Sequence, residues 1–294
     1  MNLYCIIMNT IELMGGLGNQ LFQIFTIISY SMREGKMFYF EDKSITCGWR
    51  KKLYWDTLLL EKLKVYVKDI ITIRQVASQS EDYERDNIYN EPCFNYINIP
   101  SYNDVKLFGY FQSDKYFKDH KDTIFDLIKL NDTQNNISEK YKNDIPSYDN
   151  IISIHFRIGD YKHQECNHPI LPLKYYEEAL LYILSNNPDK KDWTILYFCE
   201  EEDINCVNNK INILKNNIHF SKLTFIKINN IKEDWEQMIV MSLCYHNIIA
   251  NSTFSWWGAY LNRNDNIIIY PKIWFGSNLN HNVEDLFPKK WIRI

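Results

Sequence analysis

The stretch Ile151-Ile152-Ser153-Ile154-His155-Phe156-Arg157-Ile158-Gly159-Asp160-Tyr161 carries the clearest structural signal in this sequence. Large apolar side chains alternate with smaller or polar ones, and a period of two is typical of a β-strand with one face in the core. The alternation stops at Gly159. We therefore expect a buried strand that places Arg157 and Asp160 at its carboxyl end, with His155 on the same face as Arg157.

Strand-like and helix-like segments alternate on both sides of this stretch. Alternating patterns predict strands over residues 6–14, 37–40, 106–111, 151–157, 193–199, 223–228, 247–250 and 266–270. Helical periods predict helices over residues 19–33, 116–130, 173–185, 203–215, 232–243 and 254–262. Strands separated by helices of this length form right-handed crossovers, so the sequence predicts parallel sheets.

The alternation also suggests a division of the chain. Residues 131–150 are polar, rich in asparagine and carry one proline, Pro146, which is typical of a linker. We expect two Rossmann-like α/β domains facing across a cleft, residues 1–145 and residues 150–294, with the final segment packing back on the first domain. Ligands of open parallel sheets bind beyond the carboxyl ends of the strands, so the site is expected there.

Composition argues against several classes of protein. The formal net charge of the 294 residues is −4, which disfavours a protein whose whole surface holds nucleic acid. No run approaches the roughly 20 apolar residues of a membrane helix, and the opening residues lack the basic start of a signal peptide. The seven cysteines form no CxxC pair and are expected to be reduced. We expect a cytoplasmic protein or one peripheral to a membrane.

Arg157 is the first candidate functional residue. A guanidinium at the carboxyl end of a strand can take two oxygens of a diphosphate in a fork geometry. It would also neutralise the charge that develops on a departing nucleotide. The alternative is an internal salt bridge between Arg157 and Asp160, with His155 held by an ordinary hydrogen bond.

A second candidate is the turn Ala250-Asn251-Ser252-Thr253-Phe254-Ser255-Trp256-Trp257-Gly258-Ala259. Ser252 or Thr253 can cap a helix that starts near Phe254. The free backbone amides of such a helix start form an anion pocket, and the Thr253 and Ser255 hydroxyls could add donors. The alternative is a plain capped helix whose two tryptophans pack in the core.

A third candidate is the turn Gly15-Gly16-Leu17-Gly18-Asn19-Gln20. Leu21 stands where a dinucleotide fingerprint needs its third glycine, and no lysine completes a P-loop, so neither nucleotide motif is present. A NAD-dependent enzyme is therefore disfavoured. What remains is a tight turn in which Gly16 and Gly18 let the backbone approach a ligand, beside the amide of Asn19 at a helix start.

Together these segments resemble the α-1,2-fucosyltransferases of glycosyltransferase family 11. The matching blocks occur in the family's order, as residues 15–20, residues 109–117 (GYFQSDKYF), residues 155–161 and residues 251–259. The block LPLKYY at residues 171–176 also looks like the family. In one position the chain departs from it, because Ile158 stands where many members have a second arginine. By the strand alternation, Ile158 would face the core.

The resemblance implies a two-domain GT-B-type enzyme that inverts the anomeric centre and needs neither a metal nor another cofactor. It would transfer L-fucose from GDP-fucose to O2 of a terminal galactose or similar sugar, with domain 1–145 on the acceptor side and domain 150–294 binding the GDP-sugar. Arg157 would hold the β-phosphate, His155 would lie beside the nucleotide, and Asn19 would face the leaving group. The expected donor-binding residues are Gly16, Gly18, Asn19, His155, Arg157, Ser252, Thr253, Phe254, Ser255 and Glu236.

Several roles stay open at this point. Asp160 and His155 are both candidates for the general base, although Asp160 suits an orienting partner of Arg157 better. Glu236, together with Asp234, could recognise guanine N–H groups. The expected catalytic residues are thus Arg157, Asp160 and His155.

The remaining alternatives concern metals and the class of function. The acidic run at residues 200–203 could bind a cation, but a solvated face or a contact to ribose or guanine is preferred. His163, Cys166 and His168 lack a fourth zinc ligand, so we expect no metal. The rival functions are transfer from another GDP-deoxyhexose such as GDP-rhamnose, and a non-catalytic sugar- or nucleotide-binding protein.

Overall fold

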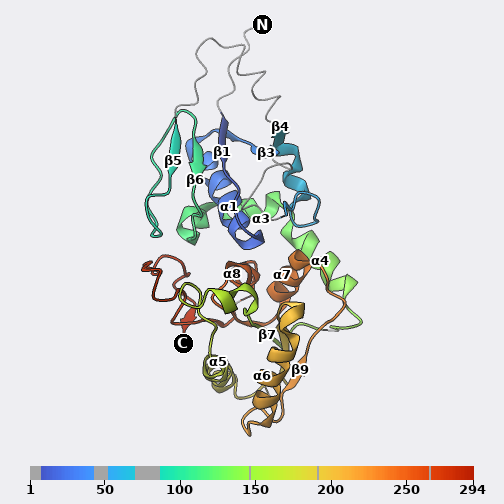
Figure 1. Ribbon diagram of the computed structural model, residues 1–294. Coiled ribbons are helices and arrows are strands. Elements are labelled where there is room, and N and C mark those ends of the chain that lie inside the picture. The colour runs from blue at the N-terminus through green and yellow to red at the C-terminus, as the bar shows by residue number, and fades with distance from the viewer. Residues whose placement is uncertain (1–7, 43–51, 70–86, 146, 191, 265) are drawn as a thin grey trace. The chain divides into compact units, whose positions relative to one another are not determined.

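The computed structural model describes residues 8–42, 52–69, 87–145, 147–190, 192–264 and 266–294. The chain divides into two compact units, Met1–Thr133 with Asn282–Pro288, and Gln134–His281 with Lys289–Ile294. Each unit contains a parallel β-sheet with helices (Figure 1), which is the α/β class that the alternation of elements predicts. The division falls after Thr133, so residues 134–145 group with the second unit. From the sequence they were expected in the first domain.

The first unit is organised around helix α1 (Leu17–Glu34). Its four-stranded sheet has the order β2-β1-β6-β5, formed by Met37–Phe38, Met8–Ile11, Lys106–Phe108 and Ile88–Asn90. A small sheet pairs β3 (Phe40–Asp42) with β4 (Val67–Asp69), and short helices follow at η1 (Glu61–Tyr66), η2 (Asp114–Tyr116), η3 (Lys118–His120) and α3 (Lys121–Leu127). Helix α1 connects β1 to its parallel neighbour β2 and is buried along most of its length.

The second unit has a six-stranded sheet in which all strands are parallel. Its order is β12-β11-β10-β7-β8-β9, formed by Ile292–Arg293, Ile268–Tyr270, His246–Ile248, Ile151–His155, Thr194–Phe198 and Thr224–Ile226. The helices of this unit are α4 (Leu130–Lys140, which begins in the first unit), α5 (Leu173–Ser185), α6 (Ile204–Asn216), α7 (Asp234–Leu243) and α8 (Thr253–Tyr260), with short η4 (Gly159–His163) and η5 (Glu201–Asp203). Strand β7 lies in the middle, between β10 and β8.

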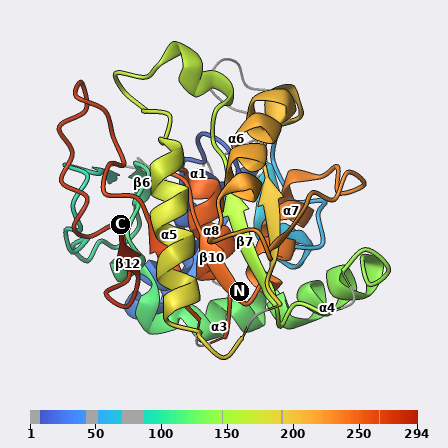
Figure 2. The same cartoon turned by 90° about the horizontal axis from the view of Figure 1, so that it is seen from below.

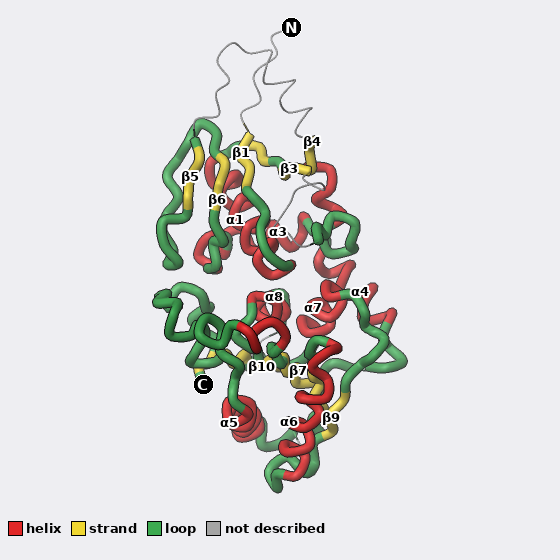
Figure 3. The backbone as a smooth tube through the Cα atoms, in the orientation of Figure 1, coloured by secondary structure: helices red, strands yellow, loops and turns green. Residues whose placement is uncertain are grey.

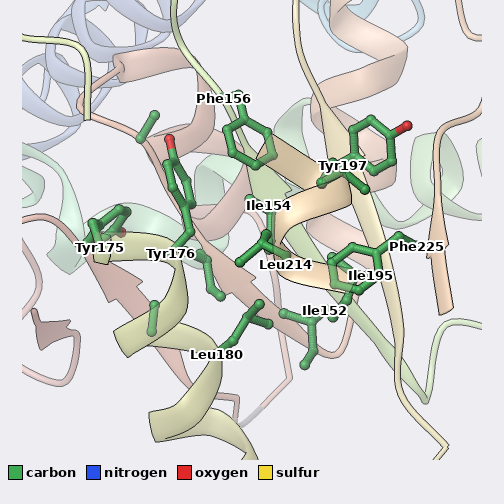
Figure 4. Packing of buried hydrophobic residues seen from close by; sticks show 14 of the residues in the cluster. Ile152, Ile154, Phe156, Tyr175, Tyr176, Leu180, Ile195, Tyr197, Leu214 and Phe225 are labelled. Carbon is green, nitrogen blue, oxygen red and sulfur yellow. The ribbon is translucent and has the colours of Figure 1, made fainter. Parts of the chain in front are cut away.

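Helices cover both faces of this second sheet. Ile152 and Ile154 of β7 pack against α5 and α6 in one apolar cluster, which Figure 4 shows from close by. Figure 2 shows the strand and the two helices from below. On the opposite face, the Asn247 amide donates to Ser153 Oγ at 2.7 Å and to the Met241 carbonyl of α7 at 2.8 Å. Both faces of β7 are therefore buried, and its polar residues Ser153 and His155 are surrounded by other parts of the protein.

Most predicted elements of the second unit are confirmed. Helix α5 has the predicted bounds, and the strands and helices around it occur in the predicted order with ends shifted by a few residues (Figure 3). Strand β7 stops at His155, two residues before the predicted end, and the short strand β12 was not predicted. Among the described residues, no helix is long and apolar enough to span a bilayer.

Two predictions near the division were wrong. The linker proposed over residues 131–150 is in large part helix α4. The single helix predicted over residues 116–130 is instead a series of short turns and α3, which ends just before Lys129. Lys129 has a φ of 55°, a left-handed conformation that interrupts a helix, and α4 starts directly after it. Residues 6 and 7 of the first predicted strand lie outside the described residues.

Candidate functional site

The carboxyl ends of β7 and β10 lie side by side in the second unit, with Ile154 opposite Ile248 in parallel register. Arg157 follows β7 by two residues, and the turn before α8 follows β10. The two sequence motifs that were predicted to bind phosphate therefore leave the sheet from neighbouring strands. This is the edge at which parallel sheets bind ligands.

Arg157 is held by two carboxylates. Its Nη2 lies 2.6 Å from Asp160 Oδ1, and its Nη1 pairs with Glu200, which follows the adjacent strand β8. Partial burial opposes the charge of Arg157, but Glu200 and Asp160 outweigh that effect and raise the pKa of the guanidinium. The internal salt bridge considered from the sequence is present, and its Glu200 arm was not foreseen.

His155 is buried beside this pair. Its ring centroid lies 5.5 Å from that of Phe254, at the start of α8, and its Nδ1 has no hydrogen-bond partner in the described part of the chain. Burial, together with the nearby charge of Arg157, lowers the pKa of His155 to about 3. The imidazole is therefore neutral near pH 7, and a pKa this low makes it a weak general base.

The start of α8 is a capped helix, as predicted. Ser252 is the N-cap, and its hydroxyl accepts a hydrogen bond from Phe254 N at 3.3 Å. The Ser255 hydroxyl is buried and accepts from Ala250 N at 3.2 Å, so it is used inside the turn. Thr253 is half-buried, and its side chain makes no hydrogen bond within the described ranges. Thr253 and the free amides are thus the groups of this turn that remain to meet a ligand.

Two tyrosines brace the strand ends from α5. Tyr176 donates its hydroxyl to the His155 carbonyl at 3.1 Å, and Tyr175 donates to the Ile249 carbonyl at 2.6 Å. These residues belong to the LPLKYY block, for which the sequence offered no role. The block now has one, because it fixes the backbone from which the Arg157 and Ser252 segments depart.

Acidic residues surround Arg157 on the side of β8. Oxygens of Glu200, Glu202 and Asp203 all lie within 4.8 Å of one another, the one group of this kind in the described residues. Asp203 is buried, accepts from Gly159 N at 2.6 Å and pairs with Lys162, while Glu200 pairs with Arg157. Two of the three carboxylates are therefore already neutralised by cations. His163, Cys166 and His168 do not form such a group in the described chain.

Glu236 makes its hydrogen bonds with residues outside the acidic group of Glu200, Glu202 and Asp203. It is buried on α7, where Lys140 Nζ reaches Oε1 at 2.6 Å and the Tyr141 hydroxyl donates to Oε2 at 2.5 Å. Both carboxylate oxygens are engaged within the unit. Its role in guanine recognition stays a prediction. Ile158, at the position where the family resemblance implied a second arginine, is 3% exposed and belongs to the core, as predicted from the strand alternation.

The glycine turn of the first unit has its own constellation. Gly15 has a φ of 76°, Gly16 caps α1, and Gly18 is buried in its first turn. Asn19 Oδ1 accepts from Gln112 Nε2 at 3.1 Å. A Cβ on Gly15 would lie 2.5 Å from Asn19 Nδ2, so the side chain of Asn19 is folded under the turn.

The GYFQSDKYF block, another motif without a role in the sequence analysis, closes this arrangement. Gln112 comes from it, and the Gly109 carbonyl accepts from Gln23 Nε2 at 3.1 Å. The family blocks therefore meet in groups: residues 15–20 with residues 109–117 in the first unit, and residues 155–161 with residues 171–176 and 251–259 in the second. These contacts join blocks that are separated in the sequence, so the sequence patterns did not indicate them.

An arginine and a capped helix start at one edge of a parallel sheet are groups that can hold an anion such as a diphosphate. The sequence profile described as "Glycosyl transferase family 11" matches residues 3–294. The chain belongs to this family and is a glycosyltransferase.

Two curated relatives from Escherichia coli match nearly the whole chain. The O-antigen biosynthesis glycosyltransferase WbnK is 29% identical over 96% of this chain and 99% of its own length. An alpha-1,2-colitosyltransferase is 28% identical over 96% of this chain and 97% of its own length.

Solved structures are similar in fold. The E. coli ADP-heptose LPS heptosyltransferase II has a TM-score of 0.50 at 10% identity, with 98% of this chain and 90% of that chain covered. The NodZ α-1,6-fucosyltransferase soaked with GDP-fucose has a TM-score of 0.47 at 13% identity, with 94% and 97% covered. The likeness to the heptosyltransferase supports the predicted GT-B fold class, and at this identity it concerns the fold alone.

Proposed function

We propose that this glycosyltransferase moves a 6-deoxyhexose, L-fucose or a close analogue, from its GDP-linked form to O2 of a galactose-type sugar in a glycan. The observation that carries the proposal is that β7 and β10 are neighbours in the sheet, so the segment that carries Arg157 and the capped start of α8 leave the sheet from adjacent strands. A diphosphate placed there would meet a permanent cation and free backbone donors. The α-1,2 linkage is supported by the family resemblance and by the name of the colitosyltransferase relative.

The donor sugar has two candidates within this proposal. GDP-fucose is favoured by the ordered family blocks, whereas GDP-colitose is favoured by the 28% identical colitosyltransferase. Colitose is fucose without its 3-hydroxyl group, so the two donors share the same GDP and the same methyl group at C5. A site built around the diphosphate would accept either, and the contact to the 3-hydroxyl would separate them.

The proposed reaction needs no metal ion. Arg157 and the start of α8 would stabilise the charge on the departing GDP, which is the work a divalent cation does in other transferases. In the acidic group beside them, Glu200 and Asp203 are already paired with Arg157 and Lys162. Activity should therefore survive treatment with a chelator, and its loss on chelation with recovery on adding a divalent cation would contradict this part.

A donor panel tests the function. The purified chain is incubated with GDP-fucose, GDP-colitose, GDP-rhamnose or GDP-mannose and a set of galactosides, and both GDP release and the linkage in the product are followed by NMR. We expect transfer to O2 from GDP-fucose or GDP-colitose. Turnover only with GDP-rhamnose, GDP-mannose or a donor carrying another nucleotide would overturn the proposal.

Arg157→Ala provides the matched test of the site. Loss of the cation should lower kcat/KM at least about 100-fold, since a group that stabilises leaving-group charge is worth several kcal/mol in the transition state. The control is Arg293→Ala, which removes an exposed arginine of the same unit. Equal activity of the two variants would show that Arg157 does not serve the reaction, and glycan binding without turnover in the wild type would indicate a lectin.

A further inference from the structure

Asn251 connects three segments of the second unit to the start of α8. It is 1% exposed and immediately precedes the N-cap Ser252. Its Nδ2 donates to the Pro169 carbonyl at 2.9 Å and to the Trp274 carbonyl at 3.2 Å. Its own carbonyl accepts from the Tyr161 hydroxyl at 2.9 Å. One buried residue therefore anchors the helix start to loops that are far from it in the sequence.

The orientation of the Asn251 amide is fixed by these bonds. Both Nδ2 hydrogens point at main-chain carbonyls, so a flipped amide would set its oxygen against two other oxygens. Its Oδ1 is buried and has no partner in the described part of the chain. Leaving a buried acceptor without a partner is unfavourable. The two hydrogen bonds that the Asn251 amide donates are therefore its structural contribution, and they hold the backbone before Ser252 in place.

Tyr161 extends this anchor to Arg157. The guanidinium carbon lies 5.0 Å from the centre of the Tyr161 ring, a cation–π geometry. The Tyr161 hydroxyl is protonated near pH 7 and donates to the Asn251 carbonyl. Burial keeps it protonated over a wider pH range, because it raises the pKa of Tyr161 to about 12. The ring also stacks on that of His168, with 4.9 Å between centroids. Tyr161 is therefore held both by its ring and by its hydroxyl, and the Arg157 guanidinium rests on this ring.

We infer that Tyr161 and Asn251 are positioning residues that fix the separation between the Arg157 guanidinium and the amide-lined start of α8. The inference rests on the proposed function, because the separation matters if one diphosphate is gripped from both sides. Rigid placement of the two elements removes an ordering cost from binding. Neither residue needs to touch the ligand, and their effect passes through Arg157 and Ser252.

The mild variant Tyr161→Phe tests this inference, because the ring stays under Arg157 and the hydroxyl is removed. GDP and inorganic pyrophosphate are titrated calorimetrically into the wild type and the variant. We expect the affinity for both ligands to fall about fivefold to tenfold, because one hydrogen bond contributes roughly 1 kcal/mol. Asn251→Ser removes both amide N–H donors and leaves one shorter hydroxyl. It should weaken binding more, and its folding is checked by circular dichroism.

The control is Tyr30→Phe, which removes a hydroxyl of the first unit that donates to the Pro100 carbonyl at the same 2.9 Å distance and accepts from Tyr102 N at 3.2 Å. It should lose stability without a change in pyrophosphate affinity. Equal pyrophosphate affinity in Tyr161→Phe, Tyr30→Phe and wild type would overturn the inference, even if fucosyl transfer is observed. If the wild type binds pyrophosphate but not GDP, the assigned nucleotide is wrong. The pyrophosphate affinities of the variants would then still test whether Tyr161 and Asn251 position Arg157 and the start of α8.

A double-mutant cycle separates positioning from general support. Arg157→Lys keeps the charge but loses the fork geometry. If Tyr161 acts through Arg157, the losses of Tyr161→Phe and Arg157→Lys in pyrophosphate affinity should be strongly non-additive. Additive losses, or wild type that binds neither GDP nor pyrophosphate, would contradict the inference.

Discussion

The ring of His155 lies 5.5 Å from that of Phe254, centroid to centroid, and this contact joins the end of β7 to the start of α8. A histidine can hold this place only while it is neutral, because it is buried and next to the charge of Arg157. The contact therefore makes the folding of the second unit sensitive to pH.

The first prediction concerns this sensitivity. The pKa of His155 is about 3 in the folded chain and 6.5 ordinarily, so between these values the unfolded chain binds a proton that the folded chain does not. The free energy of unfolding should therefore fall as pH drops below 6.5, by up to about 1.4 kcal/mol per pH unit from this residue. His155→Gln should remove that share of the slope, measured by urea unfolding between about pH 5 and 7.5.

His246, whose pKa is lowered to about 4 by burial and by Lys190, should leave a residual slope of the same sign in the variant. His219→Gln, a change at an exposed histidine, serves as the mutational control. A slope in His155→Gln as steep as in the wild type would show that His155 is not held neutral.

A second prediction follows from the pairing of Arg157 with Glu200. A diphosphate must compete with this exposed carboxylate for the guanidinium. Glu200→Gln should therefore tighten GDP binding about threefold to fivefold, since exposed ion pairs are worth at most about 1 kcal/mol. Calorimetric titration at low and high salt measures the change. Glu201→Gln removes the neighbouring exposed charge and should have a smaller effect; weaker GDP binding in Glu200→Gln would mean that Glu200 orients Arg157 for the ligand.

The parts of this fold that could be predicted are those encoded by local periodicity. The alternation around Ile154 predicted β7, and the helical spacing over residues 173–185 predicted α5 to the residue. Both segments pack an apolar face against the same core, so their patterns are unambiguous. It also followed that the Arg157 segment and the turn before α8 leave the sheet at the same edge, because parallel strands all end at the same side.

The parts that could not be predicted depend on contacts between distant segments. Nothing in the sequence near Asn19 indicates that Gln112 donates to it across 93 residues. The Glu200 arm of Arg157 and the bond from Tyr161 to Asn251 also join distant residues, 43 and 90 positions apart. The polar composition of residues 131–150 suggested a linker, yet buried positions in its first half, such as Thr133 and Ile137, supply the packed face of α4.

A third prediction uses two glycines with left-handed backbones. Gly159 has a φ of 26°, and a Cβ there would lie 2.7 Å from Glu200 Oε2. Gly35, the C-cap of α1, has a φ of 63° with no atom within 4 Å of such a Cβ. Gly35→Ala should therefore cost about 1 kcal/mol of stability through strain alone. Gly159→Ala should cost more and should also change GDP affinity, because Glu200 is displaced. An unchanged GDP affinity in both variants, measured beside their unfolding curves, would contradict this reading of Gly159.

The last prediction concerns the first unit, where Gln112 Nε2 fixes Asn19 Oδ1 at 3.1 Å. If Asn19 serves transfer, as the family resemblance implies, its amide must be held in one orientation, and Gln112 is the group that holds it. Gln112→Ala should therefore lower kcat/KM about tenfold, the value of one hydrogen bond to a poised group.

Asn19→Ala should lower kcat/KM further, and adding Gln112→Ala to it should have little additional effect, since both changes act on one amide. Gln237→Ala removes a glutamine whose Nε2 donates at the same 3.1 Å distance to the Ile231 carbonyl, and it should leave kcat/KM near the wild-type value. If the losses of Gln112→Ala and Asn19→Ala simply multiply, Gln112 acts elsewhere. In that case the contact between the glycine turn and the GYFQSDKYF block supports the fold of the first unit without tuning the reaction.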